Sequence, residues 1–396
     1  MTISEEPRIR TRVPRDAVND YTNEAARARR DFVGGWTGTD LYHVGQYSLD
    51  PAVLPGNIEN FTGVAQVPLG VAGPLRVRGE HANGDFYVPL ATTEGTLVAS
   101  YNRGMRLLAE CGGVRATVVD EQMQRSPVFV LGDALQARDF GTWIDEHIDG
   151  IRAAAESTTR TGRLTHIGQH VLGPLLYLRI NFVTGDAAGQ NMTGKATLAA
   201  CHWIQENHPG HPRYMLSGNA ETDKKHSHIN VLLTRGKRVI AEATLKRDVL
   251  LARMGVDSRD LFRYRQISQA GAFQAGSASD GVQAANALTA LFIATGQDVA
   301  NVVEGHGVIL YAQLLDNDDL YWSVTLPALI VATYGGGTAL PTQRECLEML
   351  GCYGAGKVRK FAEICAALVL AGEVSLVSAI VQGDWVTSHD ELGRNR

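Results

Sequence analysis

The chain has 396 residues, and its 37 Lys and Arg against 42 Asp and Glu give a formal net charge of -5. With 44% hydrophobic and 20% charged residues, the composition is typical of a globular protein of two or three domains and excludes wholesale disorder, collagen-like chains and coiled coils. The acidic balance argues against a nucleic-acid-binding protein. The five cysteines form no CxxC pair, so they predict neither a disulfide framework nor a zinc site and favour a reducing cytoplasm.

Residues 1–58 are predicted to form a small helical N-terminal segment. A charged amphipathic helix is expected over residues 16–32, followed by a turn at Gly34 and Gly35. The first residues lack the apolar stretch of a secretory signal or membrane anchor. The longest apolar stretch, residues 366–381, is too short to cross a bilayer and is interpreted as a buried helix. We therefore expect a soluble, cytoplasmic protein.

Residues 59–126 begin a larger domain. Short apolar strands are expected in VAQVPLGVAGPLRVRG, and a helix from about Glu94 to Cys111 is predicted to end at a Gly-Gly pair. After the next domain, the larger domain resumes with a polar loop, SGNAETDKKHSH, and a predicted hairpin in INVLLTRGKRVIAEATL. The Ala/Gly-rich run over residues 270–298 is expected to form a central buried helix, since small side chains permit close backbone approach.

Residues 127–216 carry the clearest architectural signal. The order is strand VFVL, a helix over residues 134–157, strands RLTHIGQHV and PLLYLRINFV, a helix over about residues 188–207, and strand RYML. This β-α-β-β-α-β order is that of a ferredoxin-like unit. The sequence therefore predicts an α/β (α+β) protein in which a small domain, residues 127–216, is inserted into a large one of residues 59–126 and 217–396.

Two glycine-rich stretches are candidate nucleotide sites. GCYGAGKV, residues 351–358, has the GxxxxGK spacing of a phosphate-binding loop, but Val358 replaces the hydroxyl residue and no strand precedes it. A phosphate-hydrolysing enzyme is therefore a weak alternative. GDAAGQN, residues 185–191, lies where a strand passes into a helix, so its backbone N–H groups could hold a pyrophosphate. The alternative there is an ordinary turn in which Asp186 caps the following helix.

Four titratable residues supply a Glu, a Lys, an Asp and a His without a metal-binding cluster: Glu94, Lys224, Asp298 and His389. Such a set suits carbonyl chemistry, because a cation can stabilise an oxyanion while the other groups move protons. Three of them also have a structural interpretation: a charge at a helix start for Glu94, a solvated surface lysine for Lys224 and an exposed tail residue for His389. Asp298 is the most suggestive, because a carboxylate at the end of a buried helix needs a partner.

Several motifs occur in a fixed order between Ile58 and the C-terminus. They are ENFTG, GVAGPL, ATTEGTLVASYNRG, GDAAGQNM, LSGNAETDKK, IATGQDVANV, GGGTALPTQRECLEMLG and SHDELGR. In these motifs the chain resembles the 3-hydroxy-3-methylglutaryl-CoA (HMG-CoA) reductase family. ATTEG and GGGTALPTQ look like the class I, typically NADPH-using form, here without the membrane anchor of animal and plant enzymes.

The resemblance implies reduction of HMG-CoA to mevalonate and CoA with two NADPH and no metal. It implies that Lys224 binds the thioester oxygen and that Asp298 lies beside it. Glu94 would donate a proton in the aldehyde-reducing half of the reaction, where a carboxylic acid is expected in a buried site. His389 would protonate the departing CoA thiolate, which suits the ordinary pKa range of histidine side chains. In the family the active site is shared between subunits, so a homodimer or larger assembly is expected.

The resemblance also assigns binding residues. Those matching substrate positions are Ser100, Asn102, Arg103, Arg125, Ser217, Lys225 and Asn286, of which Arg125 and Lys225 supply charge for a free carboxylate. Those matching cofactor positions are Asp186, Gly189 and Asn191 in the dinucleotide motif, with Thr159 and Arg160 at the 2′-phosphate.

The sequence also departs from the family at three places. The motif that usually reads DAMGMN is DAAGQN, the stretch after the paired lysines is HSH, and Gln283 stands where a His often contacts CoA. Two alternatives are therefore kept: a diverged reductase acting on another acyl-CoA or a carrier-protein thioester, and a noncatalytic acyl-CoA-binding relative. The presence of all four proton-handling and charged residues argues against the second.

Overall fold

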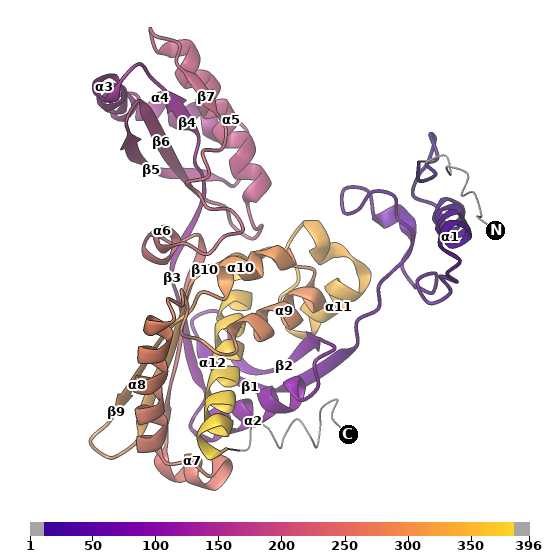
Figure 1. Ribbon diagram of the computed structural model, residues 1–396, viewed down its shortest axis with the longest axis vertical. Helices are drawn as coiled ribbons and strands as arrows, with labels where there is room; N and C mark the ends of the chain where they lie inside the picture. The colour runs from indigo at the N-terminus through magenta and orange to yellow at the C-terminus, as the bar shows by residue number, and fades with distance from the viewer. Residues whose placement is uncertain (1–11, 384–396) are drawn as a thin grey trace, which may run out of the picture.

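The computed structural model describes residues 12–383 and has a mixed α/β fold built on a ten-stranded sheet (Figure 1). The predicted fold class is confirmed. The elements up to the second half of the sheet are α1 (Asn23–Thr37), η1 (Pro51–Val53), β1 (Leu69–Gly79), β2 (Asn83–Ala91), α2 (Leu97–Glu110), β3 (Val114–Arg125), β4 (Val128–Val130), α3 (Ala134–Glu146), α4 (Ile148–Glu156), β5 (Arg163–Leu172), β6 (Leu175–Val183), α5 (Gln190–Asn207) and β7 (Arg213–Met215). The remaining elements are α6 (His228–Leu233), β8 (Gly236–Leu245), α7 (Arg247–Met254), α8 (Ser258–Gln274), α9 (Ala284–Thr295), η2 (Val299–Asn301), α10 (Val302–Gly305), β9 (Ile309–Leu314), β10 (Leu320–Leu329), η3 (Gly336–Ala339), α11 (Pro341–Met349) and α12 (Val358–Gln382).

The long strand β3 joins the two parts of the sheet. The strand order is β7-β4-β6-β3-β8-β10-β9, with β1 paired to β2 and β3, and β5 paired to β6. Most of β3 pairs with β8 in the lower part of Figure 1, while its last residues, Met123 to Arg125, pair with β6 in the upper part. Sequence reasoning did not identify β3, β9 or β10. Because β3 is continuous, it joins the upper strands to the lower part of the sheet, and the loops that follow the upper strands lie at this junction.

The upper strands have the predicted β-α-β-β-α-β order. Their antiparallel arrangement, β7-β4-β6-β5, is that of a ferredoxin-like sheet. They pack their apolar side chains into a core of their own, which includes Phe129, Phe140 and Phe182. The single helix predicted over residues 134–157 is wrong, because the chain leaves helical geometry at His147, where φ is -111° and α3 gives way to α4.

Helix α12 forms the centre of the lower core. Its residues pack against α2, α9 and the strands of the larger sheet, which confirms the buried helix predicted over residues 366–381. Its length and hydropathy would also suit a membrane span, but 83% of its most apolar window is buried inside the protein. This burial identifies α12 as a core helix of the fold.

The N-terminal helix differs from its predicted bounds. Asp16 accepts the N–H groups of Val18 and Asn19, which holds the predicted first turn in a non-helical turn. Helix α1 begins instead after Thr22, whose hydroxyl accepts the Ala25 N–H, and it runs through Gly34 and Gly35. It ends at Thr37 and is capped by Gly38, which has a φ of 72°.

Three predictions in the large domain are also wrong. The first arm of the expected hairpin is helix α6, because Ser227 caps it and Asn230 turns inward to buried polar partners. The Ala/Gly-rich run over residues 270–298 is not one helix, since α8 ends at Gln274 and only α9 is the buried central helix. Glu94 does not open α2 either; it lies in the loop before it.

Candidate active site

Lys224 and Asp298 lie together at the junction between the two parts of the sheet. Lys224 lies in the loop between β7 and α6, and Asp298 follows α9. The Lys224 Nζ is 2.9 Å from Asp298 Oδ2, and both side chains keep about two fifths of their surface exposed, at 44% and 41%. The other oxygen of Asp298 accepts the Ala300 N–H, which fixes the carboxylate at the start of η2. The arrangement therefore presents an ammonium group that is held in place and accessible.

A buried ion pair supports the backbone of Lys224. The Lys224 N–H donates to Glu304 Oε1 at 2.7 Å, and the Arg235 guanidinium donates to the same carboxylate at 3.0 Å. Both side chains of the ion pair are fully buried. Burial raises the pKa of Glu304 to about 7, against the opposing effect of the Arg235 charge and the Lys224 N–H. These contacts hold Lys224 at a φ of 54°, a conformation that a lysine rarely adopts.

The predicted acyl-carboxylate ligands have partners within the chain. Arg125 Nη1 lies 3.2 Å from Asp223 Oδ2 and 3.7 Å from Glu221 Oε1. Ser217 donates its hydroxyl to the same Glu221 oxygen at 2.5 Å. Lys225 Nζ donates to the Asp223 carbonyl at 3.1 Å. An incoming carboxylate would therefore exchange partners with these groups instead of meeting unpaired cations.

Glu94 and Asn286 form a second group, at the other end of α9. Glu94 is exposed in this chain, and its carboxylate accepts a hydrogen bond of 3.4 Å from the Asn286 amide in the first turn of the helix. Asp298 follows the last turn of the same helix. Among the described residues, no hydrogen bond or ion pair joins Glu94 or Asn286 to Lys224 or Asp298.

The three predicted ligands on α2 make contacts with neighbouring elements. Ser100 lies 3.0 Å from the Ser375 hydroxyl, and Arg103 donates to the Ser375 carbonyl at 2.9 Å. Asn102 accepts the Gly73 N–H at 2.8 Å. These side chains therefore tie α2 to α12 and to the bend in β1.

Asp186 caps a helix distant in the sequence. Its carboxylate accepts the backbone N–H groups of residues 356, 357 and 358, at 2.8, 3.1 and 3.2 Å. These groups belong to the GCYGAGKV stretch and the start of α12, so the anion held by that glycine-rich loop is the side chain of Asp186. The alternative that Asp186 caps the helix directly after it is wrong, because α5 has Gly189 at its N-cap and no side-chain cap.

The other predicted cofactor residues lie around the first turn of α5. Gly189 has a φ of 82° and no room for a Cβ, while Asn191 is exposed. Thr159 and Arg160 lie in the turn between α4 and β5, where Arg160 is exposed. A Cβ on the glycine that ends this turn would lie 2.6 Å from Met192 Sδ, so the turn packs against the start of α5. His389 lies outside the described residues.

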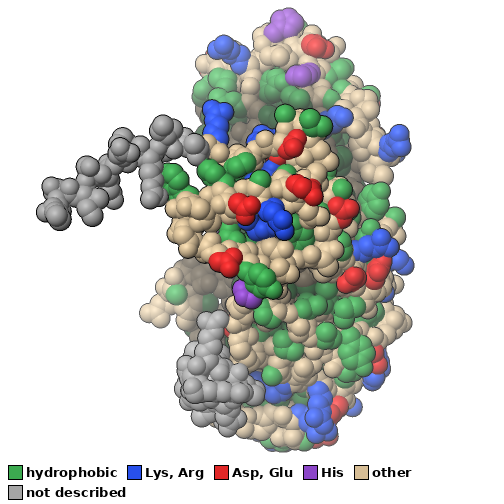
Figure 2. Space-filling model, turned by 90° about the vertical axis from the view of Figure 1, so that its right-hand side faces the viewer, with side chains coloured by type: hydrophobic (Ala, Val, Ile, Leu, Met, Phe, Trp, Pro, Cys, Tyr) green, Lys and Arg blue, Asp and Glu red, His purple; other side chains and the backbone are tan. Residues whose placement is uncertain are grey.

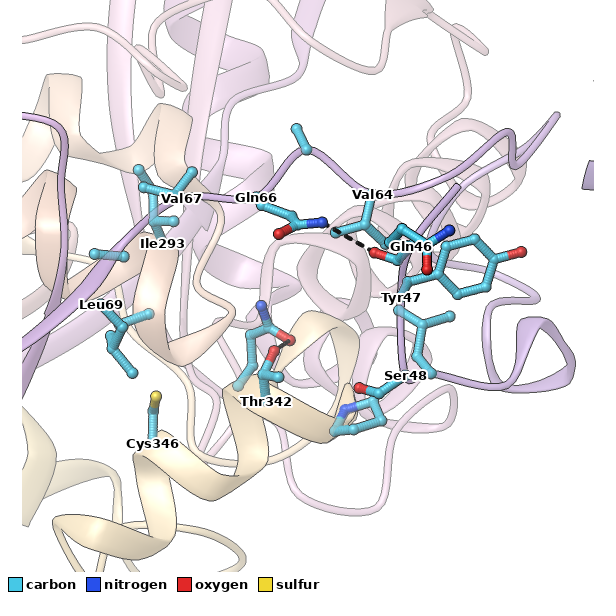
Figure 3. Close-up of a pocket in the computed structure, with 16 residues that line it drawn as sticks. Gln46, Tyr47, Ser48, Val64, Gln66, Val67, Leu69, Ile293, Thr342 and Cys346 are labelled. Atoms are coloured by element: carbon cyan, nitrogen blue, oxygen red, sulfur yellow. Dashed lines mark hydrogen bonds between the residues drawn. The ribbon is translucent and has the colours of Figure 1, made fainter. Parts of the chain in front are cut away.

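A cavity of about 650 Å³ lies elsewhere, between the N-terminal segment, α9 and α11. Figure 3 shows its mixed lining, with Val67, Leu69 and Cys346 on one side and Gln46 and Gln66 on the other. The Gln66 amide donates to the Gln46 carbonyl across this lining at 3.0 Å. None of the predicted site residues lines this cavity, so size alone does not locate the chemistry.

Sequence reasoning missed the residues beneath the Lys224 loop, above all Arg235, Glu304 and Gln190. Arg235 lies in the predicted hairpin, and Glu304 carries no motif of its own. Gln190 differs from the family motif within DAAGQN, but the sequence predicts no role for it. No local spacing connects these positions, because the fold brings them together from three separate segments.

Comparison with known proteins gives a consistent result. Residues 25–394 match the family model described as hydroxymethylglutaryl-coenzyme A reductase. The chain is 43% identical over 385 residues to the 3-hydroxy-3-methylglutaryl-coenzyme A reductase of Pyrococcus horikoshii, covering 95% of this chain and 93% of that protein. It is 43% identical over 380 residues to the protein of the same name from Methanocaldococcus jannaschii, covering 93% of each.

The fold is also similar to a solved structure. The class II 3-hydroxy-3-methylglutaryl-CoA reductase of Streptococcus pneumoniae, bound to NADPH in open conformations, matches with a TM-score of 0.67 and 20% identity, over 83% of this chain and 79% of that chain. At this identity the match supports the fold alone. Because the family model spans nearly the whole chain and the archaeal relatives exceed 40% identity, the chain belongs to the hydroxymethylglutaryl-coenzyme A reductase family.

Proposed function

We propose that this protein reduces HMG-CoA to mevalonate and CoA with two NADPH, through an intermediate at the aldehyde level. Family membership supports the reaction, and the observation that carries the site is the Lys224–Asp298 pair at 2.9 Å. NADPH supplies the hydride in each half-reaction. Each hydride addition places negative charge on the substrate oxygen, and a positioned ammonium group stabilises that charge.

The proposed proton carriers differ between the two half-reactions. Asp298 orients Lys224, which would bind the thioester oxygen and then the aldehyde oxygen. Glu94 would donate the proton to the forming alkoxide. His389 would protonate the CoA thiolate, whose expulsion belongs to the first half-reaction only.

The residues around the start of α5 fit a dinucleotide. We place its pyrophosphate at the N-terminal turn of α5, where no side chain caps the helix and backbone N–H groups can bind an anion. The exposed cation of Arg160, with Thr159 beside it, would meet the 2′-phosphate, and their turn packs on the same helix. Asp186 would shape the site by capping α12, and Asn191 would contact the cofactor from the first turn of α5.

The acyl-CoA would lie between α9 and the Lys224 loop. Arg125, Ser217 and Lys225 would hold the free carboxylate, exchanging their present partners for it. Asn286 would contact the acyl group beside Glu94. The groups on α2, namely Ser100, Asn102 and Arg103, would contact the acyl and CoA portions.

We divide the chain into three parts: residues 1–58, a large domain of residues 59–126 and 217–396, and an inserted dinucleotide domain of residues 127–216. The separate apolar core of the upper strands supports this division.

The five cysteines are free, and four of them are buried. This supports a reducing compartment, and we place the enzyme in the cytoplasm.

We further propose a homodimer, or a larger assembly, with shared active sites. The axial distance from Asn286 to Thr295 along α9 is about 14 Å at 1.5 Å per residue. Glu94 and Lys224 therefore lie at opposite ends of a helix, and Glu94 is exposed in a single chain. A second copy could place its Glu94 opposite Lys224 and bury it.

Several large hydrophobic side chains are also exposed, including Trp36, Tyr42 and Leu69. Figure 2 shows hydrophobic side chains among charged ones on the face that carries the N-terminal segment.

The test compares HMG-CoA and added mevaldehyde as substrates. The wild-type enzyme should oxidise about two NADPH per CoA released. Lys224→Ala should abolish turnover of both substrates and Glu94→Gln should impair both, whereas His389→Gln should slow HMG-CoA reduction and largely spare mevaldehyde. Near-wild-type rates in all three variants would remove the mechanistic assignment. Turnover of another thioester without turnover of HMG-CoA would select a diverged thioester reductase.

A further inference from the structure

Gln190, the first residue of α5, connects the two segments that carry the Lys224–Asp298 pair. Its Nε2 donates to Asp223 Oδ1 at 3.0 Å and to Asn301 Oδ1 at 3.1 Å. Asp223 directly precedes Lys224, and Asn301 ends the η2 turn whose start is capped by Asp298. The Gln190 amide therefore contacts Asp223, next to Lys224, and Asn301, in the turn that Asp298 caps.

The main chain of Gln190 is itself held in place. Its carbonyl accepts a hydrogen bond of 3.3 Å from Arg125 Nη2 and one of 3.0 Å from the Thr193 hydroxyl. Asn301 is almost fully buried, with 1% of its surface exposed. The amide is thus fixed from α5 on one side and from a buried acceptor on the other.

Asp223 accepts charged donors as well as this neutral one. Arg235 donates to the same oxygen as Gln190, at 3.0 Å, and Arg125 donates to the other oxygen at 3.2 Å. Arg235 also binds Glu304, which accepts the Lys224 N–H. The arginines neutralise the carboxylate, and Arg235 also reaches the Asp298 side, because Glu304 lies in α10, directly after η2. Gln190 adds a second link, from the start of α5 to the end of η2.

We propose that Gln190 is a positioning residue for the Lys224–Asp298 pair. It ties the start of α5, where the dinucleotide would bind, to the ammonium group that would stabilise the substrate oxygen. The inference rests on the proposed function. A side chain without two N–H donors would remove the contacts of α5 with Asp223 and Asn301 and let the two charged groups shift. Displacement of about 1 Å at a catalytic group can slow a reaction up to about 100-fold.

The experiment replaces Gln190 by Met, which has a similar length and no donor and is the usual residue at this place in the family motif, and by Asn, whose amide is one carbon too short to reach both acceptors. The Met variant thus tests whether this chain depends on a contact that the usual residue cannot make. We expect both variants to lower kcat at least about tenfold. The factor should be the same for HMG-CoA and for added mevaldehyde, because both half-reactions use Lys224. The KM values for NADPH and for HMG-CoA should remain within about threefold of wild type, since no binding contact is removed.

Gln205→Met is the matched control, because Gln205 lies near the far end of α5 and, within residues 12–383, its side chain donates only to the Pro212 carbonyl. It should keep the wild-type kcat. Thermal unfolding of all variants checks that they fold. Unchanged kcat in a folded Gln190→Met or Gln190→Asn variant overturns the proposal, as does a raised KM with unchanged kcat. Wild-type protein that reduces neither substrate would instead refute the proposed function.

Discussion

Glu373 shows how a single buried carboxylate can serve the fold. It lies in the middle of α12, fully buried, and accepts the N–H groups of Val282, Gln283 and Ala284 at 2.9, 2.7 and 3.2 Å. These are donors at the start of α9 that would otherwise be unsatisfied. Among the described residues no cation forms an ion pair with Glu373. Burial therefore dominates and raises the pKa of Glu373 to about 7, from an ordinary value of 4.5.

This shift predicts how stability depends on pH. Because the folded protein binds the proton more tightly than the unfolded chain, the free energy of unfolding falls as pH rises from 4.5 to about 7. The contribution of Glu373 to this fall is on the order of 3 kcal/mol. Urea unfolding of wild type and Glu373→Gln at about pH 5 and about pH 8 measures it, and the variant should lose less stability between the two.

Other buried carboxylates, including Glu304, titrate in both proteins, so their effects largely cancel in the comparison. Glu345→Gln, at an exposed position of α11, serves as a control and should follow the wild type. An equal pH-dependent loss of stability in wild type and Glu373→Gln would contradict the assignment.

At the level of elements, α12 depends on a cap from the other part of the sheet. A 25-residue helix leaves its first N–H groups and the positive end of its dipole without intrahelical partners. Asp186, which follows β6, satisfies three of the backbone groups at this end. The same contact holds the loop before α5 against α12.

Asp186→Ala should therefore lower the free energy of unfolding of the protein without cofactor by about 1 kcal/mol. Asp186→Asn, which keeps one side-chain acceptor, should lose less. Urea unfolding measures both, with Asp139→Ala as a control. Asp139 is largely exposed and, in the part of the chain that the structure describes, pairs only with the neighbouring Arg138. Unchanged stability in Asp186→Ala would mean that the cap contributes nothing and that any role of Asp186 lies in cofactor binding alone.

For the whole molecule, the two ends of α9 make a specific prediction about assembly. If Glu94 and Lys224 of one site come from different copies, a hybrid of two inactive variants contains one intact site. Mixing equal amounts of Glu94→Gln and Lys224→Ala chains, with random exchange, makes half of the dimers hybrid. Activity should then return to about a quarter of the wild-type value.

The control mixes Asp298→Asn with Lys224→Ala, because the structure places these two residues in the same chain at 2.9 Å. In their hybrid, one chain lacks Asp298 and the other lacks Lys224, so neither chain has an intact Lys224–Asp298 pair. The hybrid should therefore stay inactive. Failure of the Glu94→Gln and Lys224→Ala mixture to regain activity after demonstrated exchange would place both residues of a site in one chain.

The sequence alone predicts the order of elements in the ferredoxin-like unit and the buried nature of α12, because strand and helix periodicity and apolar runs are local properties. It also singled out Lys224 and Asp298 as members of one chemical set. It misplaced the start of α1 and the first arm of the expected hairpin, where side chains such as Asp16 and Ser227 cap turns that periodicity alone does not reveal.

Tertiary contacts, in contrast, determine which residues support the site. Arg235 and Glu304 meet beneath Lys224, Gln190 reaches both segments of the pair, and Asp186 caps α12 instead of its own helix. These contacts join residues up to 172 positions apart. A buried or half-buried polar group must find a partner, but its sequence neighbourhood does not specify which one. The partner depends on the long strand β3 and the helix α9, because these elements determine which loops lie together and which remain apart.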